Sequence, residues 1–307
     1  MDQSSPGRHL VSARGPAGKS TTMISSTAAP RAISFGEVVI DEFPGERVVA
    51  GSPLHVAVHL AALGWHAYLL TRLGVDEDAA SARAVLEEWG VDTALVQTHS
   101  ALPTGRVTVD MSGANHRFTI HGPAAWDDLQ IPHELPDHDV FCYATLAGRS
   151  QRSLATLLHL LPRAAPFKAL DVNLRPPEPF ANALTGGLGH ATLVKMGVDE
   201  LPVVAEQIGV APAPGSFLEA FPQLEWFSLS KGADGAELHS RRGEVWSAPG
   251  RNVDVVDSVG AGDAFFAGLV DALYRGLDGG DALEAAQQNA AATISRRGGL
   301  PVRNALP

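Results

Sequence analysis

The segment Asp257–Asp263, with the sequence DSVGAGD, combines glycines and carboxylates in a pattern that suits anion chemistry. Apolar residues recur at helical spacing in the residues that follow, so Gly260, Ala261 and Gly262 are predicted to begin a long helix. Backbone N–H groups at a helix start are unpaired and attract phosphate oxygens. Asp263, in the first turn, could take a proton from a hydroxyl as that oxygen attacks phosphorus. By itself the pattern also fits an acidic residue that only complements the helix dipole.

Apolar runs and helical segments alternate along most of the chain. Strands are expected at 32–40, 67–73, 94–97, 139–143, 168–173 and 191–195, and helices at 52–63, 77–89, 150–161 and 198–207. The first helix has Ser52-Pro53 at its start and Gly64 at its end, which are typical boundary residues. Such alternation predicts an α/β fold with a mostly parallel sheet covered by helices on both faces.

Two segments interrupt this alternation, at 46–50 and 104–121, and both resemble exposed antiparallel strands. In the second, the turn SGAN at 112–115 separates RVTVDM from HRFTI, two alternating β-branched stretches. A small β-flap inserted into an α/β body would give this pattern, and so would an edge hairpin without a function. A second meander is expected at 224–247.

The composition excludes several functional classes. Cys142 is the single cysteine, so the chain forms no intrachain disulfide and no zinc module built from several thiolates. The 34 acidic residues outnumber the 23 basic ones, which gives a net charge of −11 and argues against nucleic acid as a partner. No apolar stretch reaches the ~18 residues that a membrane span needs.

Residues 1–30 differ from the rest of the chain because Ser, Thr, Gly, Pro and Ala dominate, and hydrophobic residues do not recur at the spacing of a helix or a strand. We interpret them as a disordered tail, or as the result of a start codon placed too early, with an organelle transit peptide as the alternative. The apolar core of a secretory signal is absent, and we expect a cytoplasmic protein. Residues 31–307 are predicted to form the functional domain.

The wider context of DSVGAGD resembles the DTxGAGD signature of the ribokinase family of carbohydrate kinases (the phosphofructokinase-B type), with Ser258 in place of threonine. The resemblance extends from about Ile33 to Val302, and further segments follow in the order of that family. They are GEVVID at 36–41, AGSPLHVA at 50–57, DVNLRP at 171–176, KMGVDE at 195–200, SKGADG at 230–235 and NAAATISRRGG at 289–299. The SPL and DVNLRPP stretches are similar to those of fructokinases in particular.

This resemblance implies a three-layer α/β/α body with a small β-sheet lid, formed here by 46–50 and 104–121. ATP would lie along the C-terminal half of the sheet and the sugar under the lid. Asp263 would be the catalytic base, while Gly260, Ala261 and Gly262 would donate N–H groups to the transferred phosphoryl group. The residues implied on the sugar side are Asp41, Gly51, His55, Asn173, Arg175 and Arg106. Those implied on the nucleotide side are Lys195, Ser230, Gly232, Gly235, Gly262 and Asn289, the last beside the adenine.

The same resemblance implies a magnesium ion on the phosphates, held mostly through water near Glu200 and Asp257. Many members of the family also bind a monovalent cation such as K⁺ beside this loop. The lid is often a dimer surface in the family, so a homodimer through the lid is expected here as well.

Three departures from the family pattern bear on the substrate. His55 stands where the family has a sugar-binding asparagine, Gly197 replaces an asparagine or serine, and Ala50 replaces a glycine. Fructose is the first expected acceptor. A 2-keto-3-deoxygluconate-type acid is second, with Arg175 and Arg106 as carboxylate partners, and a nucleoside is third. A silent protein that binds sugar or nucleotide without turnover is the competing class.

Overall fold

The structure, a computed structural model, describes residues 28–110, 117–175, 181–296 and 298–301. The turn expected at 112–115 and nearly all of the expected tail at 1–30 lie outside these residues. The interpretation of the tail therefore stays a prediction.

Continuous apolar runs form a nine-stranded sheet, because parallel strands are buried on both faces. In spatial order the strands are β13 (Val245–Ala248), β12 (Ala236–Ser240), β11 (Trp226–Ser230), β10 (Leu193–Gly197), β9 (Phe167–Asp171), β8 (Val140–Ala144), β1 (Arg31–Phe35), β4 (His66–Leu73) and β5 (Val96–Thr98). The strands from β11 to β5 are parallel, and β12 and β13 return antiparallel. The predicted mostly parallel sheet is confirmed.

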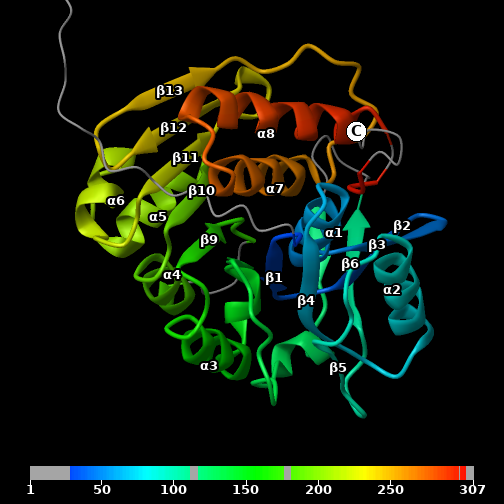
Figure 1. Ribbon diagram of the computed structural model, residues 1–307. Helices are drawn as coiled ribbons and strands as arrows, with labels where there is room; N and C mark the ends of the chain where they lie inside the picture. The colour runs from blue at the N-terminus through cyan, green and yellow to red at the C-terminus, as the bar shows by residue number, and fades with distance from the viewer. Residues whose placement is uncertain (1–27, 111–116, 176–180, 297, 302–307) are drawn as a thin grey trace, which may run out of the picture.

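Helices cover both faces of this sheet (Figure 1). One face carries α1 (Ser52–Ala62), α7 (Ala261–Tyr274) and α8 (Gly279–Ile294), and the other carries α3 (Gln151–Leu160), α4 (Ala181–Leu188), α5 (Glu200–Ile208) and α6 (Pro214–Ala220). Successive residues of β1 point to opposite faces, so Ala32 packs with the first helix group and Ile33 with the second. Helix α2 (Glu77–Glu88) belongs to a third cluster with Leu54 and Leu69. The three layers agree with the expected architecture.

A separate four-stranded sheet has the order β3 (Glu46–Ala50), β2 (Val39–Phe43), β6 (Gly105–Asp110) and β7 (Arg117–Ile120). The expected flap at 46–50 and 104–121 is therefore a sheet of its own. One expectation was wrong, because the apolar run 32–40 is not a single strand. The chain turns at Gly36, where φ is 146°, and its second half leaves the central sheet to become β2. Asp41 thus lies on the small sheet.

Ion pairs fasten the small sheet to α2. The carboxylate of Asp78, whose side chain is 5% exposed, accepts hydrogen bonds from Arg47 Nη2 at 2.8 Å and from Arg106 Nε at 2.9 Å. Arg106 was predicted to pair with a substrate carboxylate. The structure instead places its guanidinium on Asp78, because β6 runs beside the start of α2.

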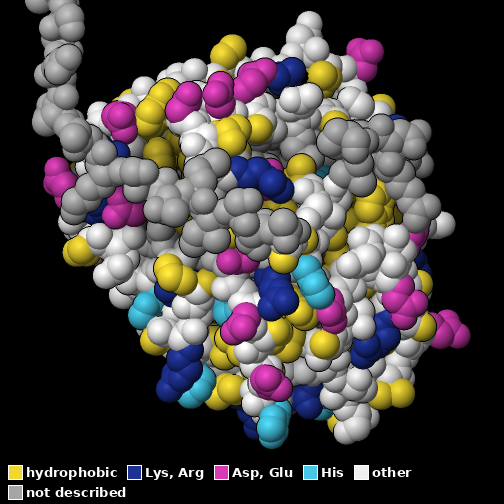
Figure 2. All heavy atoms as spheres, viewed as in Figure 1, with side chains coloured by type: hydrophobic (Ala, Val, Ile, Leu, Met, Phe, Trp, Pro, Cys, Tyr) yellow, Lys and Arg dark blue, Asp and Glu magenta, His cyan; other side chains and the backbone are white. Residues whose placement is uncertain are grey.

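No described helix is long and apolar enough to cross a membrane. On the face of the described residues shown in Figure 2, basic and acidic side chains are interspersed and form no continuous basic surface.

Candidate active site

The glycine loop and the start of α7 form the framework of the site. Gly260 is the N-cap of α7 and has a φ of 73°, a conformation that favours glycine. A Cβ at this position would lie 2.4 Å from the Cα of Gly299, so the loop and the segment near the C-terminus touch through their backbones. Within the described residues, Gly262 N–H has no acceptor, whereas Ala261 N–H is 3.3 Å from the carbonyl of Ser258. The helix start thus leaves the N–H of Gly262 free to meet an anion.

Asp263 lies in the first turn of α7 and is 9% exposed. Its carboxylate accepts a hydrogen bond from His55 Nδ1 at 2.8 Å. Burial by itself would raise the pKa of Asp263, but the His55 donor, the Ser52 side chain and the nearby Lys195 ammonium outweigh burial and hold the pKa below its ordinary value. Asp263 is therefore ionised at neutral pH, as a proton acceptor must be.

His55, expected to contact the sugar, is buried and turned toward Asp263 instead. The ring reaches the carboxylate because α1 and α7 pack side by side on the same face of the sheet. Sequence spacing could not show this contact, since the two residues are 208 positions apart.

Two carboxyl groups near Asp263 have raised pKa values. Burial raises the pKa of Glu37 to about 7 and that of Asp41 to about 6, although the positive charge of Arg175 faces both groups and opposes the rise. Glu37 is 2% exposed, and among the described residues its Oε2 has no hydrogen-bond partner. Perturbed carboxyl groups that gather in one place are typical of functional sites. Asp41 and Arg175 were predicted here from the sequence, and Glu37 was not.

We expect Glu37→Gln to stabilise the free protein at alkaline pH. The folded pKa of Glu37 is about 7 against an ordinary 4.5, so its contribution to stability is complete below pH 4.5 and is lost as the pH rises through 7. Glutamine cannot ionise and should raise the free energy of unfolding at pH 8 by about 2–3 kcal/mol relative to wild type. Urea unfolding at pH 5 and pH 8 measures the difference.

The matched control is Glu87→Gln on the exposed side of α2, which should leave stability unchanged at both pH values. A Glu37→Gln variant that loses equal stability at pH 5 and pH 8 would contradict a raised pKa at Glu37.

Gly51 is positioned by backbone packing. Its φ is 125°, and a Cβ there would lie 2.7 Å from the carbonyl oxygen of Glu37. Only glycine therefore fits where the chain enters α1 beneath the small sheet. A sugar contact at Gly51 stays a prediction.

Lys195 lies beneath the glycine loop, at the centre of a buried charge cluster. Its ammonium is 3.0 Å from both carboxylate oxygens of Asp171, and a Cβ at Gly262 would lie 3.0 Å from the same ammonium. Burial by itself would lower the pKa of Lys195, but the facing carboxylates of Asp171, Glu200 and Asp263 outweigh burial and raise the pKa. The ammonium therefore stays charged. The sequence identified Lys195 but not its partner Asp171.

Glu200 and Asp257, the expected magnesium-side residues, each connect two backbone segments. Glu200 accepts N–H bonds from Gly197 and Leu174, both at 2.6 Å. Asp257 accepts N–H bonds from Val259 at 3.0 Å and from Gly298 at 2.9 Å. Among the described residues, no group of three or more His, Cys, Asp or Glu side chains could hold a metal. A magnesium ion at this place stays a prediction.

Asn173 follows β9 and has a φ of 43°, the one positive φ at a non-glycine position among the described residues. Asparagine tolerates the left-handed region better than most residues. The adjacent Arg175 is exposed, and its Nη1 donates to the Leu174 carbonyl. This turn places Asn173 and Arg175 just after the C-terminal end of β9, whose last residue is Asp171.

On the predicted nucleotide side, Gly232 and Gly235 have φ values of 59° and 100° in the turn after β11. Ser230 ends that strand and is half-buried. Asn289 lies between α7, α8 and α1, where its amide donates to the Ala264 carbonyl at 2.7 Å and faces His59 Nδ1 at 3.4 Å. Its place beside the adenine stays a prediction.

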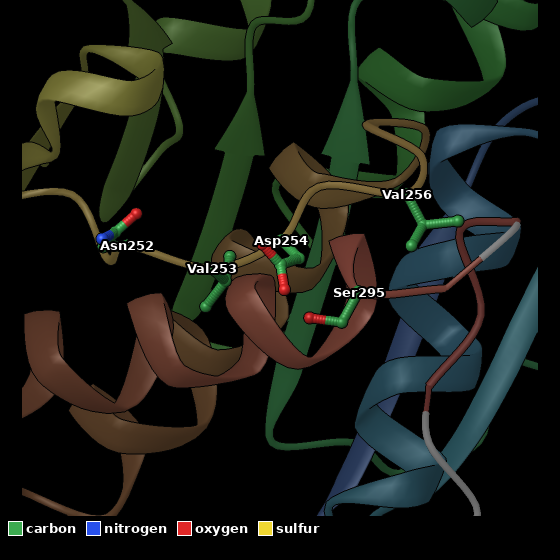
Figure 3. Close-up of a pocket in the computed structure, with 5 residues that line it drawn as sticks. All are labelled: Asn252, Val253, Asp254, Val256 and Ser295. Carbon is green, nitrogen blue, oxygen red and sulfur yellow. The ribbon is translucent and has the colours of Figure 1, made fainter.

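A cavity of about 500 Å³ lies beside the glycine loop and was not predicted from the sequence. It is lined by Asn252, Val253, Asp254, Val256 and Ser295. Figure 3 shows the first four along the segment that leads from β13 to α7, with Ser295 at the end of α8. Val256 is 59% exposed. The sequence does contain a signal for this cavity lining. The segment VDVV at 253–256, directly before DSVGAGD, is rich in valine but belongs to no helix or strand.

Comparison with known proteins agrees with this geometry. The family described as pfkB family carbohydrate kinase matches residues 20–303. A fructokinase of Klebsiella pneumoniae is 28% identical over 256 residues, which cover 78% of this chain and 83% of that protein. An aminoimidazole riboside kinase of Salmonella typhimurium is 27% identical over 260 residues, covering 78% of this chain and 80% of the relative.

Solved structures show the same fold. An uncharacterized sugar kinase from Pyrococcus horikoshii superposes with a TM-score of 0.77 at 24% identity, covering 88% of this chain and 94% of the other. A fructokinase from Xylella fastidiosa with bound ATP superposes with a TM-score of 0.75 at 22% identity, covering 88% and 95%. This chain therefore belongs to the pfkB family of carbohydrate kinases, and it is an ATP-dependent sugar kinase.

Proposed function

We propose that this chain transfers the γ-phosphoryl group of ATP to a primary hydroxyl of a small sugar, with fructose as the first candidate. The observation that carries the proposal is the ionised carboxylate of Asp263 beside the free N–H donor of Gly262 at the start of α7. A base and an anion site in contact are the minimum that phosphoryl transfer to a hydroxyl needs.

In the proposed reaction the sugar hydroxyl oxygen forms a bond to the γ-phosphorus, and the bond from that phosphorus to the β–γ bridging oxygen breaks. The electron pair of the broken bond leaves with ADP. The hydroxyl proton passes to Asp263, while N–H groups at 260–262 stabilise the charge on the transferred group. Lys195, held beneath Gly262 by Asp171, adds a fixed positive charge next to this position.

Magnesium bound to the phosphates would neutralise their charge during the transfer. Glu200 and Asp257 would hold such an ion through its waters. Their four carboxylate oxygens already accept backbone N–H bonds, so they fit an outer-shell role. Asp171, Glu200 and Asp263 all face Lys195, and this excess of negative charge also favours a cation nearby.

Fructose is favoured because the fructokinase of Klebsiella pneumoniae matches over most of both chains. The match to an aminoimidazole riboside kinase supports a nucleoside as the second candidate. A sugar acid has less support, because Arg106 is held by Asp78 and Arg175 is left as the exposed cation of the predicted pair. Asp41 on the small sheet and Asn173 after β9 are the proposed partners of the sugar hydroxyls.

The experiment is an ADP-release assay with magnesium and a panel of ketoses, aldoses, 2-keto-3-deoxy sugar acids and nucleosides. We expect the highest kcat/KM with fructose. A higher kcat/KM with a nucleoside or an acid would replace fructose as the substrate. ATP binding without ADP release on any acceptor would show a protein without turnover.

A further inference from the structure

His55 donates a hydrogen bond to the proposed base. Its Nδ1 lies 2.8 Å from Asp263 Oδ2, and the two side chains are 4% and 12% exposed. A carboxylate can only accept a hydrogen bond, so Nδ1 carries a proton whether the ring is neutral or charged. A charge-assisted hydrogen bond that is shielded from water is stronger than one at the surface.

The ring of His55 is also held by Gly299, which packs against its Cε1 and Nδ1 atoms. A Cβ on Gly299 would lie 2.7 Å from His55 Cε1, so this glycine packs directly against the ring. Gly299 is fixed in turn by His59, one turn further along α1, whose Nε2 donates to the Gly299 carbonyl at 3.0 Å. Burial lowers the pKa of His59 to about 4, so that ring is neutral and donates through Nε2. The imidazole of His55 therefore has little room to swing away from Asp263.

We propose that His55 is a positioning residue for phosphoryl transfer, which fixes one oxygen of Asp263 and keeps this carboxylate ionised through its Nδ1–H. The proposal rests on the function proposed above, in which Asp263 is the base. It assigns His55 a role on the enzyme's own base, whereas the sequence predicted a contact with the sugar.

The electrostatic surroundings explain why such a donor is needed. The titratable and charged groups that face this pair are Glu37 after β1, Asp41 on β2, His59 on α1, Asp171 on β9 and Lys195 on β10. Most are acidic, and burial raises the pKa of Glu37 to about 7. Without the Nδ1–H of His55, Asp263 would experience the same burial and the same acidic neighbours. Its pKa would then be higher than in the wild-type protein.

The test compares two substitutions at His55. Asparagine can place its amide nitrogen where Nδ1 lies, because both atoms are bonded to Cγ, whereas leucine fills the space without a donor. In the plot of kcat against pH, we expect the midpoint of the acidic limb to lie at least ~1 pH unit higher for His55→Leu than for wild type. If its midpoint reaches pH 7, kcat at pH 6 falls to about a tenth of its value at pH 8. His55→Asn should keep the wild-type limb, and KM for ATP should change less than about twofold in both variants.

The matched control is His66→Asn, because His66 Nε2 and Asp92 Oδ2 form an exposed pair at 2.9 Å at the start of β4, and neither side chain bonds to His55 or Asp263 within the described residues. It should leave the profile unchanged. A His55→Leu limb identical to wild type, or a His55→Asn limb that matches His55→Leu, would overturn the proposal. Loss of activity in Asp263→Asn combined with an unchanged His55→Leu limb would overturn the role of His55 alone. Full activity in Asp263→Asn would overturn the proposed base itself.

A second readout does not depend on turnover. A nitrogen NMR spectrum of imidazole-labelled protein should show His55 protonated at Nδ1 across the neutral range. Asp263→Ala should shift this signal, whereas the His66→Asn variant should not. A neutral His55 protonated at Nε2 instead would overturn the proposal, whichever sugar is the substrate.

Discussion

Asp263→Asn is expected to reduce kcat by ~10²–10⁴, because the neutral amide cannot accept the proton of the sugar hydroxyl. This loss corresponds to about 3–5 kcal/mol of activation free energy. The fold should persist, since asparagine has nearly the same shape and its Oδ1 can still accept the hydrogen bond from His55 Nδ1. The helix dipole at the start of α7 loses a favourable charge worth only ~0.3–1 kcal/mol. Measurements of kcat and of the ATP dissociation constant separate chemistry from binding.

The control for this substitution is Asp281→Asn. Asp281 is also an acidic residue in the first turn of a helix, α8, and it is exposed. It tests whether loss of a carboxylate at a helix start is enough to reduce the rate, and we expect kcat within about twofold of wild type. Asp271, further along α7, is a poor control because its carboxylate accepts hydrogen bonds from Trp65 and Arg275, both at 2.7 Å. If Asp263→Asn retains more than about a tenth of wild-type kcat, Asp263 is not the base.

Gly260→Ala is the second substitution with a large expected effect. The added Cβ would lie 2.4 Å from Gly299 Cα and 2.8 Å from the Gly299 carbonyl oxygen, and both contacts are with backbone. The loop must therefore move away from the C-terminal segment, which displaces the N–H groups that would meet the phosphoryl group. Loss of one such donor costs ~10²–10³ in kcat. The left-handed φ of 73° adds about 1–2 kcal/mol of strain to the folded state.

The matched control is Gly276→Ala, just after the C-terminal end of α7. Gly276 has a φ of 79°, close to that of Gly260, but a Cβ there would meet nothing within 4 Å. Both variants should therefore lose similar stability in thermal unfolding, and only Gly260→Ala should lose kcat. Equal kinetic losses in the two variants would mean that backbone strain, and not the contact with Gly299, controls the rate.

Local patterns in the sequence were sufficient for most strands of the central sheet and for the start of α7. Alternating apolar runs predicted the parallel sheet, because burial on both faces requires apolar residues at successive positions. The DSVGAGD segment predicted a helix start with free N–H groups and an acidic first turn. All of that information lies within a few adjacent residues, and the structure places Gly260 and Asp263 accordingly. The small sheet was also predicted, from alternating strands at 46–50 and 104–121.

The tertiary structure decided the partners of these residues. The run 32–40 was predicted as one strand, but the turn at Gly36 divides it between two sheets. Apolar residues can be buried in either sheet, so the apolar pattern could not show this division. His55 meets Asp263, which the sequence did not predict, since helix packing brings together residues 208 positions apart. Arg106 binds Asp78 for the same reason. A residue type predicts which interactions a side chain can form, whereas the choice of partner and the degree of burial depend on how distant elements pack.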